Sequence, residues 1–244
     1  MKRFIEACFE AVMEIEALVR LTEHSLGCET QSEGAGGDLS INYDLLAEAL
    51  FVKHLGVFGQ ILSEESGYIG EGDDLIIIDP IDGSDNLKSR FPYYGASIGL
   101  QRNGKIIAAM VCNFANGDCF VRTAKGHYRR SLFREDEYEE VCVNCHSKVG
   151  LFEKAGLHPG AARSLMDIGL KFRAPGAVAL SLSYAHAAMY VVFLGKTRPY
   201  DIEAGLYLCE DLYTYVGEDI LIVSHNKDVF AKILTIFNLF EASV

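Results

Sequence analysis

The sequence is short of positive charge. It has 22 lysines and arginines against 34 aspartates and glutamates, a formal net charge of -12 at pH 7. A phosphate backbone requires a positive footprint on its partner, so this balance argues against binding of nucleic-acid polymers. A negative surface also repels small phosphorylated molecules. A protein of this composition that binds one must hold it through a local cation, such as a metal ion.

From the sequence we expect neither an export signal nor a disulfide framework. Glu6, Glu14 and Glu16 interrupt the apolar residues of the first 20 positions, whereas a secretory signal has an uninterrupted apolar centre. The cysteines number seven, an odd count, and are scattered along the chain. Reduced thiols fit this pattern best, so we expect a cytoplasmic protein.

Only one stretch, residues 174–195, is free of charge over a length that could cross a bilayer. It opens with Pro175 and Gly176 and closes on β-branched and aromatic residues at 190–194. This order predicts a helix that runs into a strand, and not a membrane span. We therefore expect no membrane association.

Hydrophobic periodicity predicts an α/β protein. Apolar residues recur at helical spacing over the first 24 positions, and a second helix is expected with Ser40 or Asn42 as its cap. Single strands are predicted at 75–78, 94–100, 105–112 and 118–122, followed by helix 177–189, strand 190–194, helix 202–214, strand 220–223 and helix 227–240. The charged segment 128–148 would join two halves, 1–127 and 128–244, of a single domain spanning 1–244.

The sharpest motif is Asp79-Pro80-Ile81-Asp82-Gly83-Ser84, which follows a short apolar strand. Two acids at a strand-to-helix turn can converge on one point, and Gly83 lets the backbone pass close to a ligand. The amides of Gly83 and Ser84 would suit a phosphate oxygen, and hard carboxylate oxygens suit Mg²⁺. The simpler interpretation is that Asp79 and Asp82 only cap a helix and form a turn.

Two further acidic motifs flank this one. Ser63-Glu64-Glu65-Ser66-Gly67 lies upstream, and Tyr200-Asp201-Ile202-Glu203-Ala204-Gly205 lies downstream. In this order the three motifs resemble those of the inositol monophosphatase and fructose-1,6-bisphosphatase superfamily of lithium-sensitive, metal-dependent phosphatases. Two weaker similarities are Asp38-Leu39 with Asp44, and the turn at Gly176-Ala177-Val178-Ala179.

The resemblance implies the sugar-phosphatase fold, an α/β (α+β) sandwich of five layers in the order αβαβα, and usually a homodimer. It also implies hydrolysis of a phosphate ester with two or three Mg²⁺ ions per active site. By this resemblance, Glu64, Asp79 and the carbonyl of Ile81 would hold the first ion. Asp79, Asp82 and Asp201 would hold the second. Two cations about 3.5–4 Å apart suit an in-line displacement at phosphorus.

The resemblance also assigns a group that activates water. Ser84 stands where the family usually has threonine, and Asp44 would accept its hydrogen bond. Together with Glu64 they would orient and deprotonate a water molecule bound to the metal. The metal lowers the pKa of that water, so no histidine base is required.

The departures from the family pattern concern the substrate. Tyr200 replaces a tryptophan, and no carboxylate aligns with the family's inositol-binding glutamate near residues 193–195. Gly176 and Ala177 are weak candidates for substrate contacts. Lys196 and Arg198 would bind a second phosphate, or are merely solvated loop cations. The glycine-rich segment 30–37, with Glu33, is a candidate lid.

Several alternatives stay open at this point. The substrate is expected to be an inositol monophosphate-like ester, with fructose 1,6-bisphosphate or a 3′(2′),5′-bisphosphate nucleotide as alternatives. Another alternative is that the protein is a family relative that binds a partner but catalyses no reaction. The segment Cys142-Val143-Asn144-Cys145-His146 spells a c-type haem attachment pattern or half a zinc site, but two reduced cysteines are the simpler interpretation. His186 is expected to be a satisfied core histidine, and the five histidines other than His146 and His186 show no ligand spacing.

Overall fold

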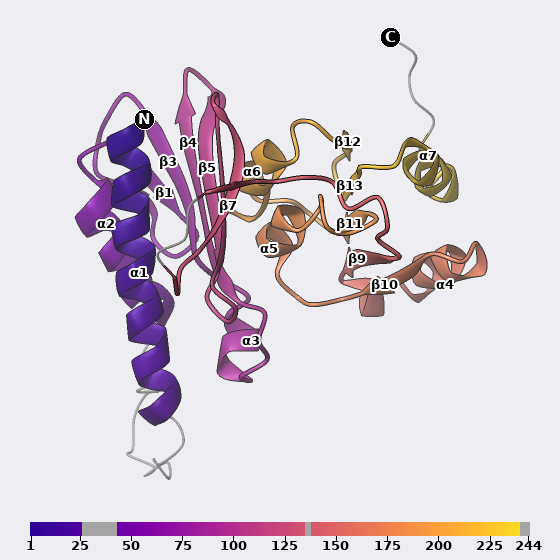
Figure 1. Ribbon diagram of the computed structural model, residues 1–244, viewed down its shortest axis with the longest axis horizontal. Coiled ribbons are helices and arrows are strands. Elements are labelled where there is room, and N and C mark those ends of the chain that lie inside the picture. Colours follow the sequence, from indigo (N-terminus) through magenta and orange to yellow (C-terminus); the bar gives the residue numbers. More distant parts are fainter. Residues whose placement is uncertain (26–42, 135–137, 240–244) are drawn as a thin grey trace.

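A computed structural model describes residues 1–25, 43–134 and 138–239 (Figure 1). Two helices, α1 (Lys2–Ser25) and α2 (Tyr43–Leu55), form the first layer. In α1 the buried side chains, among them Val12 and Ile15, follow the helical spacing of the sequence and face the first sheet. They pack with Phe51 of α2 and with buried residues of the sheet, which forms the first hydrophobic core.

The second layer is an eight-stranded sheet in the order β2-β1-β3-β4-β5-β6-β7-β8. The pairing of β1 with β3 is parallel, and the other pairings in this sheet are antiparallel. Its strands are β1 (Gln60–Ser63), β2 (Gly67–Ile69), β3 (Leu75–Asp82), β4 (Gly95–Arg102), β5 (Lys105–Asn113), β6 (Asp118–Thr123), β7 (Gly126–Ser131) and β8 (Glu139–Glu140). A short helix, α3 (Ser84–Lys88), follows β3.

The fourth layer is a five-stranded sheet in the order β10-β9-β11-β13-β12. β9 pairs in parallel with β10 and β11, whereas β13 pairs antiparallel with β11 and β12. The strands are β9 (Val149–Glu153), β10 (Lys171–Arg173), β11 (Val191–Leu194), β12 (Tyr213–Val216) and β13 (Ile220–Ser224).

Two pairs of helices complete the sandwich. α5 (Val178–Ser183) and α6 (Pro199–Leu208) lie between the two sheets. α4 (Pro159–Asp167), which follows a 3₁₀ turn at Ala155–Leu157, and α7 (Lys227–Ile236) cover the far face of the second sheet (Figure 1). Separate hydrophobic clusters fill the remaining three interfaces between layers. The five-layer αβαβα arrangement expected from the resemblance is therefore confirmed.

Some predicted boundaries were wrong. The helix expected at 177–189 ends at Ser183, where turns begin. The helix expected at 202–214 ends at Leu208, because the chain turns at residues 209–212 and then forms the edge strand β12. The segment 128–148, expected to be irregular, contributes to β7 and β8, so β7 straddles the proposed division at residues 127 and 128.

The charge-free stretch at 174–195 folds as α5, a set of turns and the buried strand β11. Among the described residues, no helix has the length and apolar character needed to cross a membrane.

Candidate metal centre

β3 carries two acids to the edge of the core. Asp79 and Asp82 lie near its end with 4% and 6% of their surface exposed. The pairing of β3 with β4 is irregular between these two residues. Asp79 accepts a hydrogen bond from the backbone N–H of Ile81 at 3.1 Å, and Asp82 accepts one from the N–H of Leu180 at 2.8 Å. Each acid is therefore fixed by a backbone donor.

Glu64 enters from the turn between β1 and β2. The buried carboxylate of Glu48 on α2 holds this turn, because it accepts hydrogen bonds from the N–H and the hydroxyl of Ser66, at 3.1 and 2.6 Å. The N–H of Glu64 itself donates to the carbonyl of Ile78 at 3.3 Å. Glu64 is thus placed beside the end of β3.

Asp201 completes the group from the first turn of α6. One carboxylate oxygen from each of Glu64, Asp79 and Asp201 lies within 4.8 Å of the others. We call these three residues together with Asp82 the acid cluster. Its members come from the two halves of the chain, and all four line one cavity of about 610 Å³.

The electrostatics of the acid cluster favour a cation. Burial raises the pKa of Asp79 well above its usual range, and the neighbouring charges of Asp82, Glu64 and Asp201 raise it further. Burial likewise raises the pKa of Glu64 and, to about 8, that of Asp82. Carboxylates crowded in a low-dielectric site repel one another until a positive charge neutralises them. An all-oxygen donor set of this kind fits Mg²⁺, with no thiolate or imidazole among the donors.

In the structure the positive charge comes from Arg198. Its guanidinium lies 2.8 Å from Glu64 and donates two hydrogen bonds to Asp201, at 2.8 and 2.9 Å. It also stacks over the ring of Tyr200, 4.9 Å from the ring centroid. Arg198 was considered for a second phosphate, but here it contacts the carboxylates expected to bind metal.

Ser84 lies beside the acid cluster at the start of α3. Its hydroxyl donates a short hydrogen bond to Asp44 on α2 and lies 3.0 Å from the carbonyl oxygen of Ile81. The pairing of Ser84 with Asp44 is the one that the family resemblance implies. Asp44 itself lies behind Ser84, outside the residues that line the cavity.

The turn at Gly176 and Ala177 also lines the cavity. Asn86 of α3 holds this turn, since its side-chain amide donates to the carbonyls of Pro175 and Tyr93, both at 2.7 Å. Gly83 has a φ of 93°, and a side chain there would meet the carbonyl oxygen of Tyr93 at 2.9 Å. Glycine at this position therefore permits the close approach of α3 to the turn.

The structure adds to the cavity residues that the sequence did not single out, among them the charged Glu153 and Lys154. Buried Glu153 accepts hydrogen bonds from the N–H of Gly176, at 2.9 Å, and from the hydroxyl of Ser181. Exposed Lys154 lies 4.6 Å from the ring centroid of Phe193. A signal was available: Glu153 ends an apolar segment, as Asp79 does.

Other expectations fall outside this cavity. Lys196 is exposed and is not among the residues that line it. The expected similarity at Asp38-Leu39, the candidate lid at 30–37 with Glu33, and the caps Ser40 and Asn42 lie outside the described residues.

Comparison with known proteins identifies similar sequences and structures. Residues 2–212 match the model of the inositol monophosphatase family. A protein of Thermococcus kodakarensis named fructose-1,6-bisphosphatase/inositol-1-monophosphatase is 26% identical over 192 residues, covering 75% of this chain and 71% of the relative. The Nus factor SuhB of Escherichia coli is 26% identical over 207 residues, covering 74% and 72%.

Solved structures share the fold. The crystal structure of the extragenic suppressor protein SuhB from Bartonella henselae superposes with a TM-score of 0.78 at 19% identity, covering 98% of this chain and 99% of that one. At this identity the likeness concerns the fold alone.

Proposed function

Because the chain belongs to the inositol monophosphatase family, we propose that it is a Mg²⁺-dependent phosphatase that hydrolyses a small phosphate monoester. The observation that carries this proposal is the convergence of Glu64, Asp79 and Asp201 within 4.8 Å, beside buried Asp82. Four acids from three separate segments line one cavity, and charges of one sign in such a site are costly without a cation beside them.

The residues divide into those that hold Mg²⁺ and those that act beside it. Glu64, Asp79, Asp82, Asp201 and the carbonyl of Ile81 would hold the ions, which when bound supply positive charge for the phosphate and lower the pKa of a water molecule. Ser84 and Asp44 then act as a proton-accepting pair next to Glu64. The backbone at Gly83 and Ser84 lines the cavity and is proposed to contact the phosphate.

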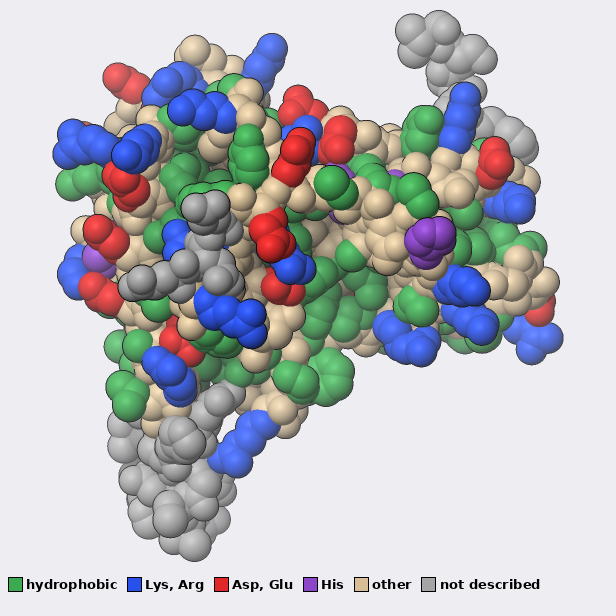
Figure 2. Space-filling model, viewed as in Figure 1, with side chains coloured by type: hydrophobic (Ala, Val, Ile, Leu, Met, Phe, Trp, Pro, Cys, Tyr) green, Lys and Arg blue, Asp and Glu red, His purple; other side chains and the backbone are tan. Residues whose placement is uncertain are grey.

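The surroundings of the cavity support an anionic substrate despite the negative net charge. Figure 2 shows that Lys and Arg side chains gather along the edge formed by β10 and α4. Lys171 and Arg173 on β10 are exposed there, and Lys154 lies at the cavity itself. A local positive field of this kind draws phosphorylated molecules toward the metal site.

The substrate is proposed to be an inositol monophosphate-like ester or a sugar bisphosphate. Lys154 favours a substrate with a second anionic group, because it is a cation that lines the cavity. The relative from Thermococcus kodakarensis carries both activities in its name. A 3′(2′),5′-bisphosphate nucleotide satisfies the same charge argument.

The experiment that tests the proposal is phosphate release from inositol 1-phosphate, fructose 1,6-bisphosphate and phosphoadenosine phosphate, each with and without Mg²⁺. Release that depends on Mg²⁺ from any of them supports the proposal and names the substrate class. Release that is unaffected by removing Mg²⁺ with a chelator contradicts the metal chemistry.

A second candidate function is binding without catalysis, which the likeness to the Nus factor SuhB brings forward. The intact acid cluster favours the phosphatase. Absence of turnover across the panel, combined with absence of Mg²⁺ binding by calorimetry, would favour the binding role. Homodimerisation and a cytoplasmic location remain predictions from the family resemblance and the sequence; light scattering on the purified protein measures the first.

A further inference from the structure

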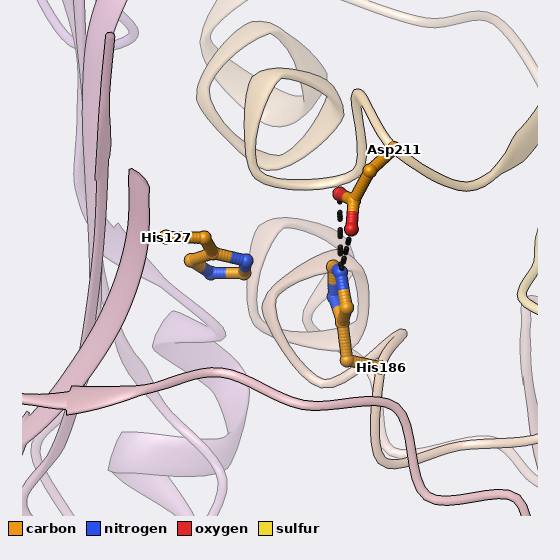
Figure 3. A group of neighbouring side chains, drawn as sticks. All are labelled: His127, His186 and Asp211. Atoms are coloured by element: carbon orange, nitrogen blue, oxygen red, sulfur yellow. Dashed lines mark hydrogen bonds and ion pairs between the residues drawn. The ribbon is translucent and has the colours of Figure 1, made fainter. Parts of the chain in front are cut away.

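A second cluster of potential metal ligands lies between the first sheet and the α5/α6 layer. His127 on β7 and His186, three residues after α5, have ring centroids 4.7 Å apart. Only 7% and 2% of their surfaces are exposed. Asp211, beyond the end of α6, places its carboxylate 3.1 Å from Nε2 of His186 (Figure 3). We call His127 and His186 the histidine pair.

Most ring nitrogens of the histidine pair have no hydrogen-bond partner among the described residues. Both ring nitrogens of His127 and Nδ1 of His186 are buried, and none of these three atoms has a hydrogen-bond partner among the described residues. Figure 3 shows the ring of His127 directed at that of His186. Buried polar atoms are paired in the great majority of cases, so three unpaired nitrogens at one point require a specific explanation.

We propose that His127, His186 and Asp211 bind a divalent transition-metal ion, with Zn²⁺ as the preferred ion. One ligand atom from each residue lies within 4.8 Å of the others. Two ligand atoms on one tetrahedral zinc ion are about 3.4 Å apart, so these atoms have to approach one another by up to about 1.4 Å, which rotation of the side chains supplies. Two imidazoles and one carboxylate leave a fourth position for water or another side chain.

The chemistry of the donors separates this site from the acid cluster. Imidazole nitrogen selects zinc, copper and nickel, whereas a site of carboxylate oxygens alone selects Mg²⁺. Burial, followed by the nearby His186, lowers the pKa of His127 to about 3, which leaves this imidazole neutral with a free lone pair. The site therefore does not depend on the proposed phosphatase activity.

The neighbouring charges set how tightly the ion is held. Arg122 forms an ion pair with Asp211 and competes with a metal for that carboxylate. Arg122 also donates to the carbonyl of Leu208 at 2.9 Å and lies 3.7 Å from the carboxylate of Glu210. Arg122 therefore keeps its contacts with Leu208 and Glu210 if the carboxylate of Asp211 binds the metal.

One member of the histidine pair borders a cavity. This cavity, of about 280 Å³, is lined by His186 together with Cys142. The segment with the haem-like pattern lies alongside, because the N–H of Asn144 donates to the carbonyl of His186 at 2.8 Å. Cys142 and Cys145 are exposed, so the experiment has to separate these thiols from the histidine pair.

The proposed role of the ion is structural. His127 belongs to the first sheet, and His186 and Asp211 follow the two helices that cover it. One ion bonded to all three would tie these layers together, and binding to the folded state alone raises stability.

The test uses the full chain with Mg²⁺ in excess, so that the acid cluster is filled. The protein is incubated with Zn²⁺, desalted and analysed for zinc by mass spectrometry. Wild type and the control His158→Gln are expected to retain about one zinc per chain, and His127→Gln and His186→Gln less than about a tenth of that. Zinc is also expected to raise the unfolding temperature of wild type but not of the two pair variants.

Two outcomes would overturn the proposal. One is full zinc retention by a folded His127→Gln protein. The other is loss of zinc in the double variant Cys142→Ser/Cys145→Ser with the histidine pair intact, which would assign the metal to the thiol segment. Anomalous diffraction from wild-type crystals at the zinc edge needs no variant: a peak between His127, His186 and Asp211 supports the site, and a peak only elsewhere contradicts it.

Discussion

The guanidinium of Arg198 lies 2.8 Å from the carboxylate of Glu64, within the group of acids that would bind metal. In the same position it donates two hydrogen bonds to Asp201. Arg198 therefore supplies the positive charge that the acid cluster needs in the absence of a metal ion, and it competes with any ion that uses these two carboxylates.

This competition predicts that Arg198→Ala tightens Mg²⁺ binding. The side chain of Arg198 is 52% exposed, so its ion pairs are weakened by solvent and a two- to five-fold lower Kd, corresponding to about 0.5–1 kcal/mol, is expected. Isothermal titration calorimetry measures the effect, with Arg173→Ala on exposed β10 as the control. Weaker binding in Arg198→Ala would show that Arg198 supports the metal site.

The role of the Ser84 hydroxyl in catalysis can be tested by two substitutions. This hydroxyl donates to Asp44 and lies 3.0 Å from the carbonyl of Ile81, so Ser84→Ala removes a proton acceptor pair beside Glu64. A fall in kcat of about 10²-fold is expected, with a smaller change in KM. Ser84→Thr keeps the hydroxyl and is expected to retain most activity. Equal losses in both variants would mean that Ser84 serves packing alone.

The buried acids make the metal-free protein sensitive to pH. Burial raises the pKa of Asp82 from 3.8 to about 8, so between these values the folded state binds more protons than the unfolded state. The stability of the metal-free protein is therefore expected to fall as pH rises from about 4 to 8. Thermal unfolding in chelator at pH 6 and pH 8 measures this fall.

Asp82→Asn is the matched variant for that experiment. The amide carries no charge, so its unfolding temperature is expected to change less between pH 6 and pH 8 than that of wild type, and to exceed it at pH 8. A variant as sensitive as wild type would show that Asp82 is not the group that titrates.

The fold itself can be tested at Gly95 on β4. A Cβ atom at this position would lie 1.7 Å from the carbonyl oxygen of Cys112 on the neighbouring strand. Gly95→Ala is expected to lower the free energy of unfolding by about 3 kcal/mol or more, since the clash is with backbone. Gly160→Ala on α4, where no atom of the described residues lies within 4 Å of the added Cβ, is expected to be neutral or slightly stabilising. Urea unfolding compares the two.

The sequence predicted what depends on local pattern. The apolar run before Asp79 predicted a buried strand that ends in acids, and β3 has that form. The helix predicted at 202–214 was too long, because the pattern did not reveal that Tyr213 begins an edge strand paired with β13.

Contacts between segments that lie far apart in the chain could not be predicted from the sequence pattern. His186 was expected to be satisfied, yet its Nδ1 has no described partner and its nearest ring belongs to His127 on another element. Neither histidine shows ligand spacing along the chain, since only the packing of β7 against the α5/α6 layer brings them together. For Arg198 the sequence left two alternatives, a ligand of a second phosphate or a solvated loop cation, and it did not reveal the tertiary ion pair with Glu64.

The central claim is that the acid cluster holds the Mg²⁺ on which catalysis depends, and Asp79→Asn tests it most directly. The amide keeps the shape of the side chain and the oxygen that accepts from Ile81, but removes the charge. Calorimetry and phosphate release are measured on the same preparation, with Asp73→Asn in the exposed loop before β3 as the control. The account predicts that Asp79→Asn loses both Mg²⁺ binding and turnover while Asp73→Asn keeps both. Turnover near the wild-type rate in a folded Asp79→Asn protein would contradict it.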